Sequence, residues 1–92
     1  MRVRVRGFLT FRDVIGAREV ELEDGATLRA ALQHLAAEDD AVAGQVYTAA
    51  EGLRPGVAVL VNGRHHTHTE VGLDAILGDG DEVAVFPPLV GG

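Results

Sequence analysis

The chain has 92 residues, of which 47% are hydrophobic, and it carries a net charge of −6. A chain of this length forms one small domain that buries roughly 60–65% of its unfolded surface. The negative charge argues against a nucleic-acid-binding protein, because phosphate groups require a basic footprint. There is no cysteine, which excludes disulfides, thiolate metal sites and a cysteine nucleophile.

The N-terminal residues alternate arginine with valine and lack the continuous apolar core of a signal peptide. No segment approaches the roughly 20 apolar residues that a membrane span needs. We therefore expect a cytoplasmic protein with no membrane partner. All eight basic residues are arginine, so the domain offers no lysine amine as an acyl acceptor.

Two segments, 2–9 and 18–23, alternate apolar and charged residues in the manner of half-buried strands. Val3, Val5 and Leu9 share one face of the first segment, while Val20 and Leu22 share one face of the second. The charged positions are Arg2, Arg4 and Arg6 in the first segment and Glu19, Glu21 and Glu23 in the second. A hairpin of the two would set arginines opposite glutamates, and we expect this pairing to be structural.

Thr27 can cap a helix that we expect over residues 28–38, after a break at Asp24–Gly25. Its apolar stripe is Leu28, Ala31, Leu32, Leu35 and Ala36. The acidic residues 38–40 are predicted to form the solvent-exposed end of this helix. Residues 39–56 predict turns and a short helical or extended piece around 46–47.

The apolar run 57–61 predicts a central strand covered on both faces, closed by a tight turn at Asn62–Gly63. Residues 73–77 predict a brief helical turn, and 82–86 predict the last strand, with Val83 and Val85 in phase. The element order fits an α+β fold in which one main helix packs across a mixed sheet of about four to five strands.

Two polar clusters resemble metal sites. His65, His66 and His68 follow the turn, with Glu70 and Asp74 nearby, and histidines in a polar loop are usually exposed. The acidic run 78–82 lacks the ligand spacing of a twelve-residue calcium loop and is better explained as a turn. We expect no native metal at either cluster.

The sequence closes on Gly91–Gly92, after the strand of residues 82–86 and the dipeptide Pro87–Pro88. Glycine has no Cβ, so a diglycine end is thin and sterically open around its last carbonyl. Two prolines favour an extended course. We expect a single domain over residues 1–92, with a flexible tail over 87–92 that can enter the site of another protein.

Residues 77–92 resemble the C-terminus of MoaD, the small subunit of molybdopterin synthase, and residues 59–64 are similar to the central strand and turn of that family. The relative ThiS shares the diglycine end but usually lacks the approach Phe86–Pro87–Pro88. The resemblance implies the ubiquitin-like β-grasp fold.

The resemblance also implies a carrier cycle. A ubiquitin-activating-enzyme-like adenylyltransferase would use ATP to convert the Gly92 carboxylate to an acyl-adenylate, and a sulfur donor would make it a thiocarboxylate. The MoaE-like large subunit would then use that sulfur to build the dithiolene of the molybdenum or tungsten cofactor. The chain would be a cosubstrate with no stably bound cofactor and no activity alone.

The tail residues that would enter the partner channel are Gly91, Val90, Leu89, Pro88 and Pro87. Phe86 belongs either to a docking face or to the rim of the core. Two alternatives stay open: a sulfur carrier for thiamin, cysteine or tRNA thiolation, and a ubiquitin-like modifier joined to proteins through Gly92.

Overall fold

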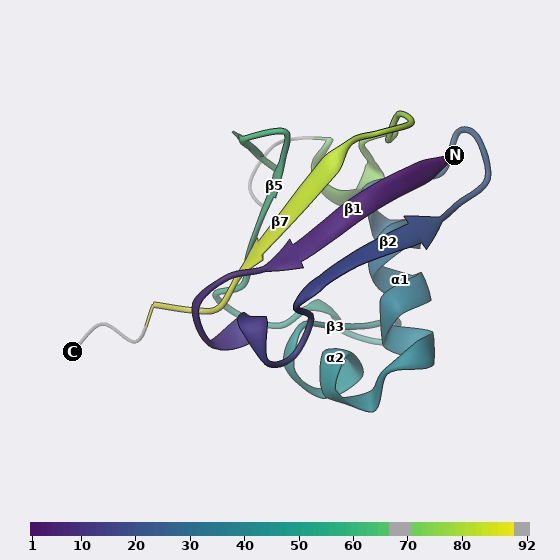
Figure 1. Cartoon of the computed structure of the whole chain (residues 1–92). Helices are drawn as coiled ribbons and strands as arrows, with labels where there is room; N and C mark the ends of the chain where they lie inside the picture. The colour runs from purple at the N-terminus through teal and green to yellow at the C-terminus, as the bar shows by residue number, and fades with distance from the viewer. Residues whose placement is uncertain (67–70, 90–92) are drawn as a thin grey trace.

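A five-stranded mixed sheet with one main helix across it forms the body of the molecule (Figure 1). The structure is a computed structural model, and it describes residues 1–66 and 71–89. The strand order is β2-β1-β7-β5-β6, and the strands are β1 (Arg2–Gly7), β2 (Ala17–Glu21), β5 (Ala58–Val61), β6 (Arg64–His65) and β7 (Glu82–Phe86). The predicted α+β class and β-grasp architecture are confirmed.

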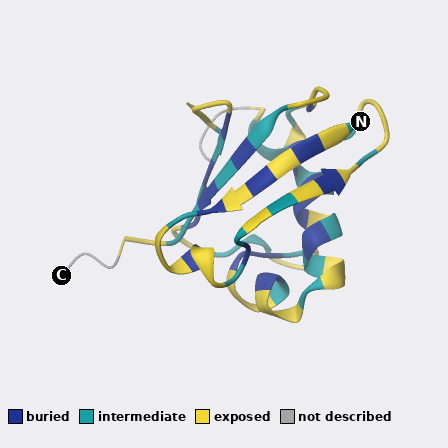
Figure 2. Cartoon of the chain, in the orientation of Figure 1, coloured by how far each residue is buried: buried dark blue, intermediate teal, exposed yellow. Residues whose placement is uncertain are grey.

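Strands β1 and β7 pair in parallel at the centre of the sheet, with Val5 opposite Val83. Figure 2 shows buried and exposed residues alternating along β1, so the valines face the core and the arginines face outward. The antiparallel β1–β2 hairpin sets Arg2 opposite Glu21 and Arg4 opposite Glu19, which confirms the predicted charge pairing.

Helix α1 (Leu28–Glu38) covers the inner face of the sheet and coincides with the predicted helix. The Thr27 side chain accepts a hydrogen bond from the Ala30 N–H at 3.2 Å, as expected of an N-cap. Leu28, Leu32 and Leu35 are buried against the valines of the sheet in a single core. The helical turn predicted over 73–77 is present only at its start, as the 3₁₀ turn η2 (Gly72–Asp74). Ala75 is extended and Ile76 forms an antiparallel bridge with Thr27, so the rest of that prediction is wrong.

The region after α1 holds a second helix that the sequence did not predict. Asp39 caps α2 (Asp40–Gln45) by accepting the Ala41 N–H at 2.9 Å. The same carboxylate accepts a 2.6 Å bond from Arg18, which itself binds backbone carbonyls of the β1–β2 loop. The solvated end predicted for residues 38–40 is therefore wrong at Asp39, which joins two elements. A small hairpin follows, β3 (Tyr47–Thr48) and β4 (Gly52–Leu53).

Two strand predictions need correction. Residue Leu9 lies in a 3₁₀ turn, η1 (Leu9–Arg12), and is 56% exposed, because the chain turns after Gly7 to begin the hairpin loop. Strand β5 is next to the edge of the sheet, beside the short β6, while β7 is central. Only Val59 and Val61 of β5 are buried, and Ala58 and Leu60 stay half-buried on the outer face. The hairpin turn at Asn62–Gly63 is confirmed by positive φ at both residues.

None of the helices within residues 1–66 and 71–89 is long and apolar enough to cross a lipid bilayer. The cytoplasmic location stays a prediction.

The Arg18–Asp39 contact gives the stability of the fold a dependence on acid pH. The hydrogen bond from Arg18, and then the one from Ala41, lowers the pKa of the Asp39 carboxyl below its usual value. A lowered folded-state pKa stabilises the fold above the unfolded pKa of about 3.9, and this stabilisation is lost as the pH falls through the folded value. Asp39→Asn keeps a helix-capping side chain but removes the charge. As the pH falls below about 5, the free energy of unfolding of this variant should therefore decline less steeply than that of the wild type.

Urea unfolding between pH 2 and pH 7 would measure this difference. Asp13→Asn, at an exposed loop position, removes the same charge and serves as the control. Parallel pH profiles for Asp39→Asn and Asp13→Asn would contradict the prediction.

Candidate functional site

The C-terminal segment leaves the sheet at Phe86, the last residue of β7. Its half-buried ring stacks on Phe8, with ring centroids 4.8 Å apart and planes within 11° of parallel. The Phe8 N–H donates to the Val85 carbonyl at 3.0 Å, which extends the parallel pairing past the end of β1. The Arg6 guanidinium lies 5.2 Å from the centroid of the Phe8 ring, at cation–π distance. Stacking and backbone pairing thus anchor the start of the segment.

The next residues run away from the domain body (Figure 1). Pro87 is half-buried and Pro88 is exposed, with Pro88 directly beside Gly56. Leu89 is 87% exposed, although it is apolar. Val90, Gly91 and Gly92, the remaining residues of the predicted tail, lie outside the described residues. The segment therefore presents an apolar side chain to solvent directly after two residues of restricted φ.

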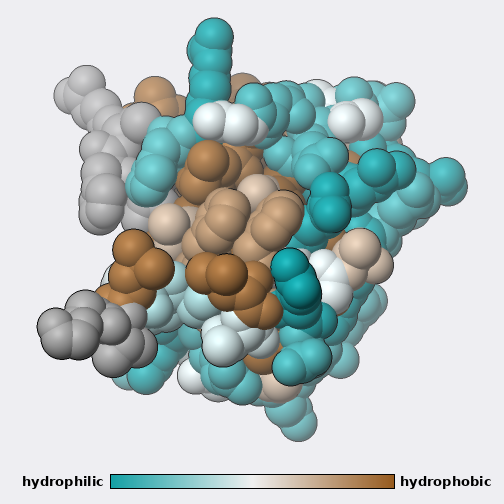
Figure 3. All heavy atoms as spheres, turned by 60° about the vertical axis from the view of Figure 1, so that its left-hand side comes forward, coloured by the Kyte–Doolittle hydropathy of each residue, from teal (hydrophilic) through white to brown (hydrophobic). Residues whose placement is uncertain are grey.

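The outer face of the sheet has an apolar half beside this segment. Strand register sets Ala58 opposite Phe86 and Leu60 opposite Ala84, and all four are half-buried residues out of phase with the core. Figure 3 shows a contiguous group of hydrophobic side chains on this side of the molecule, bordered by hydrophilic residues. We call Ala58, Leu60, Ala84, Phe86 and Phe8 the apolar half. Phe86 therefore lies on the outer face, outside the core cluster.

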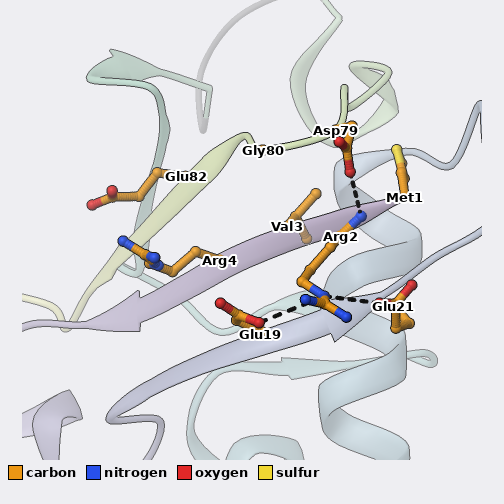
Figure 4. A pocket seen from close by; sticks show the side chains of 9 residues that line it. All are labelled: Met1, Arg2, Val3, Arg4, Glu19, Glu21, Asp79, Gly80 and Glu82. Atoms are coloured by element: carbon orange, nitrogen blue, oxygen red, sulfur yellow. Dashed lines mark hydrogen bonds and ion pairs between the residues drawn. The ribbon is translucent and has the colours of Figure 1, made fainter.

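The other half of the outer face is charged and forms an open pocket of about 530 Å³ between β2, β1 and the turn before β7 (Figure 4). The Arg2 Nε donates to Glu21 at 2.8 Å and lies 3.5 Å from Glu19. Its hydrogen bond to Glu21 raises the pKa of Arg2 above its usual value. The Asp79 carboxylate accepts the Arg2 backbone N–H at 2.8 Å. Arg2 is therefore paired with the glutamates of β2, as the sequence predicted for this hairpin.

Neither polar cluster forms a metal site among the described residues. The His66 Nδ1 lies 2.8 Å from the carbonyl of Arg64, and Asp74 lies 3.3 Å from Arg29, while His68 and Glu70 fall outside the described residues. No group of three potential ligands occurs within residues 1–66 and 71–89. In the acidic run, the Asp81 carboxylate accepts the Gly78 N–H at 2.7 Å, which makes the predicted turn.

The structure adds two residues to the site that the sequence did not single out. Phe8 and Gly56 both touch the C-terminal segment, one at Phe86 and the other at Pro88. Phe8 follows a strand of alternating residues, and Gly56 follows a proline in a turn. Neither local pattern indicates a contact with the end of the chain.

A β-grasp sheet with a parallel central pair and an exposed segment leaving the central strand is the ubiquitin-like fold. The chain belongs to the ThiS family, whose model matches residues 5–92.

Individual relatives match this chain over most or all of their length. The chain is 42% identical to Small archaeal modifier protein 3 of Haloferax volcanii over 94 residues, covering all of both chains. It superposes on the solution structure of the Haloferax volcanii HVO 2177 protein with a TM-score of 0.83 and 41% identity, over 100% of this chain and 87% of the other. A Pyrococcus furiosus protein provisionally designated molybdopterin converting factor, subunit 1, gives a TM-score of 0.73 and 30% identity over 96% and 98%.

Proposed function

We propose that this chain is a sulfur carrier, and the small subunit of a molybdopterin synthase, that works through the carboxylate of Gly92. The observation that carries the proposal is the exposed, proline-stiffened segment leaving the central strand of a ThiS-family domain, with Leu89 87% exposed. The similarity to the Pyrococcus furiosus protein supports the molybdopterin assignment.

In the first step, an adenylyltransferase of the ubiquitin-activating type joins the Gly92 carboxylate to the α-phosphate of ATP and releases pyrophosphate. In the second step, sulfide-level sulfur from a donor attacks the acyl carbon of Gly92. The new C–S bond replaces the C–O bond to the phosphate, AMP leaves, and Gly92 ends as a thiocarboxylate. The adenylate is an electrophile and the thiocarboxylate is a strong nucleophile, so one carbon takes part in both steps. The partner enzyme uses the ATP, and the chain itself holds no cofactor.

Each tail residue has a physical role in this cycle. Gly91 and Gly92 leave the reacting carbonyl unhindered, because they have no Cβ. Val90 and Leu89 would pack in the channel of the partner, where apolar burial contributes to binding. Pro87 and Pro88 fix φ, which lowers the entropy lost when the segment enters that channel.

The apolar half of the outer face would dock the partner while the tail enters its site. Leu60→Asp should weaken binding to the activating enzyme about tenfold or more, because it places a charge at the centre of an apolar contact. Ile76→Asp is the matched control, since Ile76 is 73% exposed beside the start of α1, away from the segment. Titration calorimetry with the purified enzyme would measure both affinities. Equal losses for the two variants would contradict this docking face.

A second function, protein modification through Gly92, is favoured by the 42% identity to Small archaeal modifier protein 3. Both functions begin with the same adenylate and differ in the group that attacks its acyl carbon. In the carrier this group is the sulfur of a donor, and in the modifier it is the amine of a lysine on another protein. A sulfur carrier for thiamin, cysteine or tRNA thiolation would share the terminal chemistry with a different final enzyme.

The experiment that tests the proposal is the intact mass of the untagged chain after incubation with ATP, sulfide and its activating enzyme. We expect a mass gain equal to the replacement of one oxygen by sulfur, localised to Gly92. Sulfur transfer from this product to a pterin precursor with a large subunit would establish the molybdopterin assignment. Isopeptide-linked diglycine remnants on cellular proteins, without such transfer, would establish the modifier function instead. An unchanged mass would overturn the proposal.

A further inference from the structure

We propose that Gly56 sets the direction in which the C-terminal segment leaves the domain, and so is a positioning residue for the activation of Gly92. This inference rests on the proposed function for its kinetic consequences, but the contact itself lies entirely within the described residues.

Gly56 occupies the third position of a tight turn that precedes β5. The Val57 N–H donates to the Arg54 carbonyl at 3.2 Å, with Pro55 and Gly56 between them. Gly56 has a φ of +82°, so the turn has the proline and the left-handed glycine of type II. Because Ala58 pairs with Phe86, this turn lies directly beside the point where β7 ends.

The absence of a side chain at residue 56 is what lets Pro88 pass. A Cβ built on Gly56 would lie 2.8 Å from the Cβ and 3.1 Å from the Cγ of Pro88. Contacts this short force one group to move, and the proline ring has little freedom to bend away. Pro88 would have to shift as a unit, and the segment beyond it would shift as well.

Gly56 acts together with the stack at the start of the segment. Phe86 stacks on Phe8 on the outer face, and two residues later Pro88 lies so close to Gly56 that a Cβ there would collide with its ring. Contacts at two points of this short segment restrict the direction of its backbone. The restricted φ of Pro87 and Pro88 keeps that direction up to Leu89. The segment therefore leaves with a direction set by the folded domain before any partner binds.

A fixed direction matters because docking and chemistry use different parts of the molecule. The apolar half would hold the partner, while the reacting carboxylate lies several residues further along the chain. A misplacement of about 1 Å at a reacting group can cost about 100-fold in rate. A changed exit direction should therefore lower the turnover of adenylation while leaving docking nearly intact.

Gly56→Ala tests this, with Gly25→Ala as the matched control. Gly25 has a φ of +87° and no atom within 4 Å of an added Cβ, so alanine there brings the same backbone strain without the collision. In ATP–pyrophosphate exchange with the activating enzyme, we expect Gly56→Ala to lower kcat at least tenfold, with KM within about twofold of wild type. Gly25→Ala should match the wild type in both constants.

A double-mutant cycle identifies the contact through which Gly56 acts. Pro88→Gly removes the ring atoms that an alanine at position 56 would meet, so adding Gly56→Ala to Pro88→Gly should lower kcat no further. Equal kcat for Gly56→Ala and Gly25→Ala would overturn the inference, and so would an undiminished effect of Gly56→Ala in the Pro88→Gly background.

Backbone NMR separates this inference from the proposed function. Amide residual dipolar couplings of Leu89, referenced to those of β7, should change in Gly56→Ala and stay at the wild-type values in Gly25→Ala. Unchanged couplings in both variants would overturn the positioning role. Absence of pyrophosphate exchange with the wild-type chain, together with changed couplings, would overturn the proposed function and leave the contact established.

Discussion

Deletion of Gly91 and Gly92 is expected to abolish ATP-dependent activation of the chain, with a loss of at least about 100-fold in pyrophosphate exchange. The shortened chain would end at Val90, whose branched side chain crowds the carboxylate and whose carbonyl lies two residues short of the reacting position. Folding should be unaffected, because the buried core ends at Val85. Exchange kinetics and urea unfolding of the same preparation would measure the two properties.

Gly92→Ala is the control for this deletion, because it keeps the length of the chain and its terminal carboxylate. It should retain more activity than the deletion, with a loss that reports only the added methyl group. Full exchange activity in the deleted chain would remove the basis for assigning Gly92 as the acyl donor.

The largest expected effect on stability comes from Gly7→Val. Gly7 is buried at the end of β1, and an added Cβ would lie 2.2 Å from the carbonyl oxygen of Phe11 and 3.0 Å from the Ile15 Cβ. That oxygen accepts hydrogen bonds from the N–H groups of Val14, Ile15 and Gly16 in the β1–β2 loop, so it cannot move away without breaking them. Overpacking of this kind costs 1–3 kcal/mol or more, and we expect about 3 kcal/mol in urea unfolding.

Gly44→Ala is expected to raise the free energy of unfolding in the same urea assay, whereas Gly7→Val lowers it. Gly44 lies in α2, and no atom lies within 4 Å of an added Cβ. Alanine has the higher helix propensity, so we expect a gain of about 0.5 kcal/mol. A loss of unfolding free energy below about 1 kcal/mol for Gly7→Val would contradict the prediction, because it would mean that the β1–β2 loop moves aside without cost.

The sequence predicted the elements whose local patterns agree with their packing. Residues 2–7 alternate because one face of β1 is buried, and α1 has both a cap at Thr27 and a continuous apolar stripe. Helix α2 was missed because it spans six residues, contains Gly44 and buries only Val42. The run 57–61 was misplaced at the sheet centre, since its apolar residues Ala58 and Leu60 lie half-buried on the outer face of a strand next to the sheet edge.

The candidate site also contains residues that the sequence could identify and residues that it could not. The tail is contiguous in sequence, so its prolines and glycines could be identified directly. Phe8 and Gly56 meet it only after the strands pair, because Phe8 stacks on a residue 78 positions later in the chain (86 − 8). A contact of that separation leaves no periodic signal in one sequence, and only the register of β1 and β5 against β7 reveals it.

The place of β7 in the sheet also determines how this domain can fold. Strand β7 lies between β1 and β5, yet it is the last strand in sequence within residues 1–66 and 71–89. During synthesis, the edges of β1 and β5 that face β7 therefore cannot form their sheet hydrogen bonds until residues 82–86 have left the ribosome. Closing such a long-range parallel pair is slow, because loop entropy is lost before the contacts form. A nascent chain that stops before β7 cannot complete the sheet, so every folded copy already contains the strand that continues into the C-terminal segment.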